Sequence, residues 1–492
     1  MQPKSRELVR IMLGGAILSI ALLSASLAAN AGSHCPGYSQ CPAIDYAQTM
    51  NENTDAIALS AEIASEEQKA LAQAQKKNLP SGERNKQLGR LLFFDVTLSV
   101  RGNQACATCH SPKMGFSGGI SQINRTVVSF PGSVFPRAGN RRPIAAAYGA
   151  FAPPLHYESK TDEFIGGTFW DAGATGEVTG SPAADQAMAP FVNPLEMAMP
   201  DRACVLYRVA KGQYASVFKA VWGIDLQSIA WPENTEKVCQ KPGQGGSLTP
   251  LKLSTTDRLF ANNAYQKLAQ SIASFEISSA VSPFTSKFDA VLAGTATLTA
   301  QEAHGLKLFN SDAVGCGECH ASGGNRPLFT DFSATNIGIP SNRNNPFLHE
   351  DVDNGKGLIA NPLGTAFVDN GIGPILQASN NSSWRAMASR FMGMFQVPSL
   401  RNVARGGNKG MTRAFMHNGF FTDLKMVVHF YNTRDVLPRC NGSGVVGVDC
   451  WPAPEQPANL NTEELGNLGL SDQDEQDIVA FLKTLTDGYK SK

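Results

Sequence analysis

Several features that would assign a sequence to a simple class of protein are missing from this chain of 492 residues. Neither sign of charge is in excess, because lysine plus arginine and aspartate plus glutamate both number 42, so nothing predicts a nucleic-acid partner. After residue 31, no apolar run reaches the ~18 residues that are needed to cross a bilayer. Few segments alternate apolar and polar residues as strands do. These absences favour a helical protein, and the length favours two large domains.

The N-terminus has the pattern of a secretory signal. Three basic residues, Lys4, Arg6 and Arg10, precede an apolar run from Ile11 to about Ala28. The small residues Ala29-Asn30-Ala31 that follow this run offer a cleavage site. Residues 1–31 are therefore predicted to direct the chain to the periplasm. An uncleaved membrane anchor is the alternative.

Ten cysteines suit an exported protein better than a cytosolic one. Six of them fall into pairs that are close in sequence, and we predict that each pair forms a disulfide. Proximity alone supports this pairing, since six thiols allow 15 connectivities, and buried free thiols are the alternative. The pairs are Cys35/Cys41, Cys204/Cys239 and Cys440/Cys450.

The other four cysteines stand in two copies of the motif Cys-x-x-Cys-His, at Cys106-Cys109-His110 and Cys316-Cys319-His320. In this motif the two thiols bond the vinyl groups of a c-type haem, and the histidine is an axial ligand of the iron. Composition predicts roughly 0.003 such matches by chance. Zinc sites usually place a second cysteine pair within about twenty residues, but these motifs lie 210 residues apart. The sequence therefore predicts two covalently attached haems.

A similar segment precedes each motif, Gly89 to Phe93 before the first and Gly305 to Phe309 before the second. Each segment would end an amphipathic helix, and its glycine would allow close approach to a haem edge. We predict an all-α fold of two cytochrome c-like haem domains with long ordered loops, notably 111–160 and 321–385. The predicted boundaries are an N-terminal extension at 32–83, a first domain at 84–285 and a second at 286–492. Further helices are predicted at 61–77, 203–222, 257–280 and 471–486, the last with a Ser471-x-x-Asp474 cap.

The order of several short motifs resembles the bacterial dihaem cytochrome c peroxidase and MauG family over roughly residues 84–486. These motifs are Leu91 to Asp95, Phe169-Trp170-Asp171, Glu196-Met197, Leu400 to Val403 and His417-x-Gly419. The resemblance implies two cytochrome c-like domains whose haems face a shared interface. The first haem would bind hydrogen peroxide at an open face, and the second would be six-coordinate and relay electrons.

The resemblance also implies roles for individual residues. Trp170 matches the tryptophan between the haems, although the family usually reads Trp-Asp-Gly-Arg where this chain has Ala172-Gly173 after Asp171. Glu196 matches the glutamate beside the peroxide, and Gln186 and Pro190 match its neighbours. Cleavage of the O–O bond needs a proton moved from the inner to the outer oxygen, which a carboxylate at hydrogen-bond distance can do.

Many of the peroxidases hold a histidine on the first haem until the second haem is reduced. That histidine would fall within residues 125–137, but this chain has no histidine between His110 and His156. The first haem is therefore predicted to be open without reductive activation. His156 is the alternative ligand, although it follows Ala152-Pro153-Pro154, past the matching position.

The second haem's distal ligand in the peroxidases is a methionine fourteen residues after the histidine that matches His417. That count reaches Tyr431 here, and the MauG branch also has tyrosine at this place. Met426 and His429 are the nearby alternatives. On a helix, His429 lies about 200° from Tyr431, so both cannot face one iron. An anionic phenolate favours oxidised iron, whereas a thioether favours Fe(II).

The family commonly binds calcium between its domains. Thr412 matches one carbonyl ligand, but the asparagine ligand is replaced by Arg141, next to Asn140. We weigh three functions: a MauG-type enzyme that uses peroxide to oxidise a protein partner, a conventional peroxidase supplied with electrons by a small cytochrome c or cupredoxin, and a dihaem electron carrier without catalytic activity.

Overall fold

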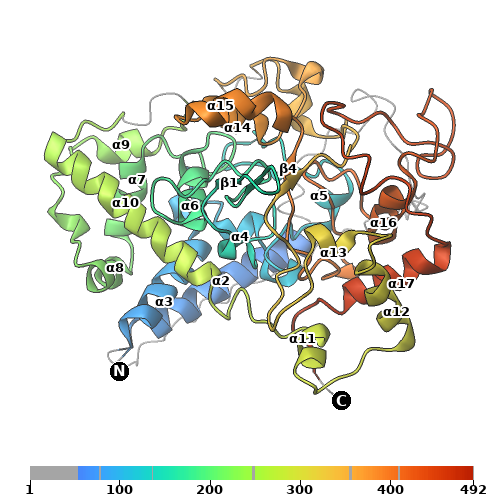
Figure 1. Cartoon of the computed structure of the whole chain (residues 1–492). Helices are drawn as coiled ribbons and strands as arrows, with labels where there is room; N and C mark the ends of the chain where they lie inside the picture. The colour runs from blue at the N-terminus through green and yellow to red at the C-terminus, as the bar shows by residue number, and fades with distance from the viewer. Residues whose placement is uncertain are drawn as a thin grey trace, which may run out of the picture. The chain divides into compact units, whose positions relative to one another are not determined.

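A computed structural model describes residues 54–76, 79–135, 137–245, 250–353, 357–407 and 410–490 (Figure 1). The predicted signal and the Cys35/Cys41 pair lie outside these residues. Within them, no helix combines the length and the apolar character that a membrane crossing requires. The compact unit that contains them runs from Ala43 to Lys492.

Helices dominate the described residues, and the β-structure is limited to strands of two or three residues. The first half contains α2 (Thr54–Ala74), α3 (Ser81–Phe94), α4 (Cys106–Cys109), α5 (Ser121–Arg125), α6 (Pro182–Val192), α7 (Arg202–Lys211), α8 (Ala215–Trp222), α9 (Thr235–Cys239) and α10 (Thr255–Glu276). The second half contains α11 (Lys287–Leu292), α12 (Ala300–Phe309), α13 (Cys316–Cys319), α14 (Gly373–Ala378), α15 (Ser382–Met387), α16 (Leu424–Thr433) and α17 (Asp472–Lys483).

The described residues also contain several short 3-10 helices and two small antiparallel sheets. Strand β1 (His156–Glu158) pairs with β2 (Glu163–Ile165), and β3 (Ala334–Thr335) pairs with β4 (Phe395–Gln396). Long loops connect the helices, as the sequence predicts.

Each half buries its own hydrophobic cluster. The first cluster draws on residues 56–281 and the second on residues 288–485. The predicted domain boundary at 285/286 falls between these two ranges and stays a prediction.

The two halves repeat one arrangement of helices. In the first, α3 packs against α10, and in the second, α12 packs against α17 (Figure 1). A Cβ atom on Gly89 would lie 1.9 Å from the carbonyl oxygen of Ser271, and one on Gly305 would lie 1.9 Å from that of Asp477. Both glycines therefore allow two helices to cross closely. The sequence interpretation was incomplete here, since the partner of each glycine is a helix backbone and not a haem edge.

The packing of aromatic rings is also repeated between the two halves. Phe93 packs 5.9 Å from Phe116 and 5.3 Å from Phe275, measured between ring centroids. In the second half the corresponding centroids, from Phe309 to Phe329 and to Phe481, are 6.3 and 5.1 Å apart. The duplication inferred from the motifs thus extends to the core.

Candidate functional site

Each Cys-x-x-Cys-His motif forms one helical turn, and its histidine follows as the C-terminal cap. Nδ1 of His110 lies 3.1 Å from the carbonyl oxygen of Phe116, and Nδ1 of His320 lies 2.9 Å from that of Phe329. Both phenylalanines have left-handed backbone, with φ of +58° and +54°. These contacts fix the ring orientation and leave Nε2 of each histidine available for a metal.

The four motif cysteines form no disulfide, and burial raises the pKa of each thiol, to about 12 for Cys109, Cys316 and Cys319. Burial also lowers the pKa of His320 to about 4, so its imidazole is neutral at physiological pH. Among the described residues, no three or more His, Cys, Asp or Glu side chains gather as a zinc site requires. Paired neutral thiols beside a neutral imidazole suit covalent haem attachment.

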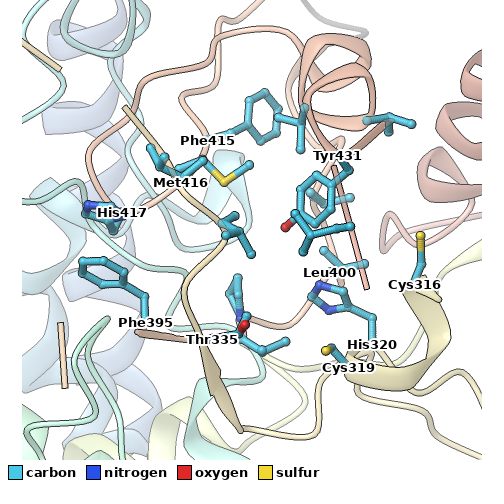
Figure 2. Close-up of a pocket in the computed structure, with 18 of the residues that line it drawn as sticks. Cys316, Cys319, His320, Thr335, Phe395, Leu400, Phe415, Met416, His417 and Tyr431 are labelled. Carbon is cyan, nitrogen blue, oxygen red and sulfur yellow. The ribbon is translucent and has the colours of Figure 1, made fainter. Parts of the chain in front are cut away.

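A cavity opens beside the second motif, with Cys316, Cys319 and His320 on one side (Figure 2). The hydroxyl of Tyr431 points into this cavity from α16. Its lining also includes Leu424, Val427 and Val428, which share the helical face of Tyr431. His320 and Tyr431 thus line the same cavity from two sides.

The two alternative ligands on α16 lie elsewhere. His429 contacts Glu475 with an Nδ1–Oε1 distance of 2.8 Å, and Met426 packs against Gly447. Neither residue lines the cavity. Burial, followed by the neighbouring Cys319 and Cys316, raises the pKa of the Tyr431 phenol.

Trp170 is a buried residue in the loop that precedes α6. Its indole N–H donates to the carbonyl oxygen of Arg142 at 2.9 Å, and its ring lines the cavity. Residues Ile144 and Ala145 line the same cavity, and the backbone of Ile144 also lies near the His110 ring. One short segment therefore connects the first histidine with the cavity of the second motif.

Asp171, which follows Trp170, pairs with an arginine from another segment of the chain. The family motif would supply an arginine two residues after this aspartate, where this chain has Gly173. Asp171 forms an ion pair of 2.6 Å with Arg141, which also pairs with Asp369 at 2.7 Å. Two adjacent arginines in Asn140-Arg141-Arg142-Pro143 were the sequence signal for this contact, but the sequence did not indicate their partners.

Glu196 lies in the turn that follows α6. The backbone N–H of Glu196 donates to the carbonyl of Asn193 at 3.1 Å, and the side chain lies close enough to Cys109 and Cys106 to raise their pKa. Burial raises the pKa of Glu196 itself to about 7. Gln186, on α6, is partly buried. The glutamate is thus placed near the first motif in a half-buried position.

The segment that carries a histidine in many peroxidases is packed onto the Glu196 turn. The backbone N–H of Ser133 donates to the carbonyl of Glu196 at 2.6 Å, and Arg137 donates to the carbonyls of Pro194 and Gly243 at 3.2 and 2.8 Å. His156, the alternative ligand, is exposed on β1.

The residues expected to hold calcium do not fit a cation site. The carbonyl of Thr412 accepts a hydrogen bond of 2.9 Å from Asn124, and its hydroxyl accepts one of 3.0 Å from Arg125. The carbonyl of Asn140 accepts one of 2.6 Å from Asn345. Arg141, at the asparagine position, supplies a positive charge of its own.

Two of the predicted disulfides are present, Cys204–Cys239 and Cys440–Cys450, which confirms those pairings. The sequence reasoning assigned no role at the site to three buried groups that line the cavity: Arg142, Arg413 and His417.

The chain is similar to several known proteins. The profile of the di-haem cytochrome c peroxidase family matches residues 83–297. The methylamine utilization protein MauG of Paracoccus denitrificans is 32% identical over 407 residues, which cover 81% of this chain and 88% of MauG. The cytochrome-c peroxidase IdrP1 of Denitromonas iodatirespirans is 26% identical, with coverage of 81% and 80%.

A solved structure is also similar. The diheme peroxidase BthA of Burkholderia thailandensis superposes with a TM-score of 0.60 and 25% identity, and the match covers 82% of this chain and 86% of BthA. The protein is therefore a haem oxidoreductase with two c-type haems, and the chain belongs to the di-haem cytochrome c peroxidase and MauG family.

Proposed function

We propose that this protein is a periplasmic enzyme that consumes hydrogen peroxide at the first haem and uses the second haem to oxidise a residue of a partner protein. The observation that carries the proposal is Tyr431, which faces His320 across the cavity where the conventional peroxidases have methionine. A conventional peroxidase is the second candidate, favoured by the 26% identity to IdrP1.

Glu196 performs the proton transfers at the first haem. Cys106, Cys109 and His110 would hold the first haem, which would supply the iron site for peroxide and the electrons for cleavage of its O–O bond. The Glu196 carboxylate takes the proton from the inner oxygen of the peroxide and returns it to the outer oxygen, which leaves as water. Its raised pKa, about 7, suits both steps near neutral pH.

The peroxide site needs no activation step in this proposal. The backbone N–H of Ser133 and the guanidinium of Arg137 donate to backbone carbonyls of the Glu196 turn, and the sequence carries no histidine within residues 125–137. The absence of histidine between His110 and His156 leaves His110 as the single protein ligand on the first iron.

Trp170 and Tyr431 direct the oxidising equivalents. Trp170 conducts electrons between the haem sites, and the carbonyl of Arg142 holds its indole N–H. The Tyr431 phenolate stabilises an oxidised second iron better than a thioether would. The oxidising equivalents from peroxide can then be shared between the two haem sites. The partner protein can be oxidised at the surface of this protein and does not need to enter the peroxide site.

Export and the domain division are part of the same proposal. The disulfides Cys204–Cys239 and Cys440–Cys450 support folding in an oxidising compartment, in agreement with the predicted signal at residues 1–31. Residues 84–285 form the peroxide-binding domain, and residues 286–492 form the relay domain.

The test compares wild type with Tyr431→Phe. In wild type we expect a low-spin ferric second haem without a methionine–iron charge-transfer band, and oxidation of a co-expressed partner when peroxide is added. In Tyr431→Phe we expect partner oxidation to fall by at least ~10-fold, while peroxide reduction by a small artificial donor survives. Oxidised residues in the partner are identified by mass spectrometry.

Two results would contradict the proposal. A methionine band in wild type would assign the second haem to the conventional peroxidases. Equal loss of both activities in Tyr431→Phe would make Tyr431 a structural residue, because the first haem and Glu196 are unchanged in that variant. His429→Gln is the matched control on α16, and it should keep both activities.

A further inference from the structure

Arg142 and Arg413 are buried side chains that line the cavity of the second haem. The backbone N–H of Arg142 donates to the carbonyl of His417 at 2.9 Å, and its Nε donates to the carbonyl of Met416 at 2.8 Å. Figure 2 places His417 on the far side of the cavity from Cys316. The guanidinium of Arg142 is therefore anchored beside the end of the cavity that is remote from the cysteines.

Neither guanidinium has a carboxylate partner among the described residues. Arg142 also donates to the hydroxyl of Ser117 and the carbonyl of Pro143, whereas Arg413 donates to the carbonyls of Met114 and Asn402. Burial, followed by the charge of Arg413, lowers the pKa of Arg142 to about 9, and burial lowers that of Arg413 to about 10. Two neighbouring cations are thus held out of water without a counter-charge, which is costly.

Two further donor positions at this end of the cavity lack partners. Nε of Arg413 and Nε2 of His417 are buried and make no hydrogen bond within the described residues. The nearest carboxylate to His417 is that of Glu455, at 3.8 Å, which is beyond hydrogen-bond distance. The site is therefore rich in donors and poor in acceptors.

The carboxylates nearby are occupied. Asp369 pairs with Arg141, and Glu455 accepts hydrogen bonds from the backbone of Asp369 at 3.0 Å and from Asn418 at 3.4 Å. An anion that balances Arg142 and Arg413 must therefore come from outside the chain.

The tether at Cys316 and Cys319 identifies this anion. A haem bonded through its vinyl groups places its two propionate carboxylates on the opposite edge of the ring. Guanidinium groups bind carboxylates strongly through parallel N–H donors. We propose that Arg142 and Arg413, with His417 as a further donor, bind the propionates of the haem attached at Cys316 and Cys319. This inference needs only the bound haem and does not depend on the proposed oxidation of a partner.

The test measures the reduction potential of each haem in the intact protein, together with the propionate bands in resonance Raman spectra. The variants are Arg142→Gln and Arg413→Gln, which remove charge, and Arg413→Lys, which keeps it. Arg385→Gln is the matched control, since Arg385 is exposed and its guanidinium donates to the carbonyl of Ser379 at 2.7 Å, away from the cavity lining. A Cys316→Ala background, in which one thioether is lost, shifts the absorption of the second haem and so labels it.

The proposal expects a negative shift in the potential of the labelled haem in both glutamine variants, because loss of a positive charge favours the ferric state. The shift should be smaller in Arg413→Lys and absent in Arg385→Gln, and the propionate bands should move in the glutamine variants. Unchanged potentials and bands would overturn the proposal, as would a shift confined to the haem at Cys106 and Cys109. If the glutamine variants take up no haem, wild-type Raman bands typical of free propionates would overturn it equally.

Discussion

His110 and His320 are oriented by carbonyl groups of phenylalanines in the same unusual conformation. Phe116 and Phe329 both have positive φ, which costs a residue with a Cβ atom roughly 1 kcal/mol or more. The repeated contact shows that both halves keep this backbone shape to fix a histidine. The sequence predicts the two histidines from their motif. It does not predict their phenylalanine partners, because these follow the histidines at two different spacings, six and nine residues.

At Glu196 we predict a pH-dependent rate. Burial raises the pKa of this carboxyl to about 7, so it is protonated below that pH and ionised above it. The ionised form accepts the proton of peroxide, and the rate of O–O cleavage should therefore rise with pH through about 7. Glu196→Gln should lower this rate by roughly 10²–10⁴ and remove the inflection. Stopped-flow absorption after peroxide addition measures both effects.

A matched variant separates the role of Glu196 from a general effect of charge. Glu177 is exposed, and Glu177→Gln should leave the rate and its inflection as in wild type. An inflection near 7 that persists in Glu196→Gln would assign the titration to another group.

Some residues of the site could be predicted from the sequence and others could not. Tyr431 and Glu196 lie at fixed distances from recognisable motifs, and the structure places both beside haem-binding cysteines. Arg142 and Arg413 are 271 residues apart in the sequence. Their proximity results from packing between the halves, which no local pattern encodes.

At the scale of elements, the helix α17 begins as predicted, with Ser471 and Asp474 forming a reciprocal cap. The helix predicted at 203–222 is instead two helices, α7 and α8, which are separated at Gly212. Apolar periodicity continues across this break, so the pattern alone did not reveal it. Gly212 favours termination because glycine gains more freedom than other residues outside a helix.

The two helix crossings predict a pair of equivalent defects. Gly89→Ala would place a methyl group 1.9 Å from the carbonyl oxygen of Ser271 on α10, and Gly305→Ala would do the same to Asp477 on α17. Because both obstacles are backbone atoms, the helices must separate. Each variant should lose about 1–3 kcal/mol of unfolding free energy, measured by chemical denaturation of the holoprotein.

Gly82 provides the control on the same helix as Gly89. A Cβ atom there would meet nothing within 4 Å, so Gly82→Ala should be neutral or stabilising by about 0.5–1 kcal/mol. Equal losses in Gly82→Ala and Gly89→Ala would show that the close helix crossing does not determine the effect, because alanine favours a helix more than glycine does.

At the scale of the whole molecule, the two halves are joined by ion pairs and hydrogen bonds between distant segments. Arg141 reaches from the first half to Asp369 in the second, and Asn124 reaches to Thr412. These contacts occupy the positions at which the resemblance implies calcium. A guanidinium held by two carboxylates can perform the bridging role of a divalent cation.

We therefore predict that chelators leave this protein unchanged. Dialysis of the holoprotein against EDTA should shift neither the thermal midpoint nor the haem spectra, and added Ca²⁺ should have no effect. Arg141→Asn restores the asparagine and leaves Asp171 and Asp369 without their cation. This variant should lose about 3–5 kcal/mol of stability in EDTA, since the removal of one partner leaves a buried charge uncompensated. Calcium should return part of that loss, because carboxylate and amide oxygens are its preferred ligands. A wild-type midpoint that falls in EDTA and recovers with Ca²⁺ would show that the cation site persists beside Arg141.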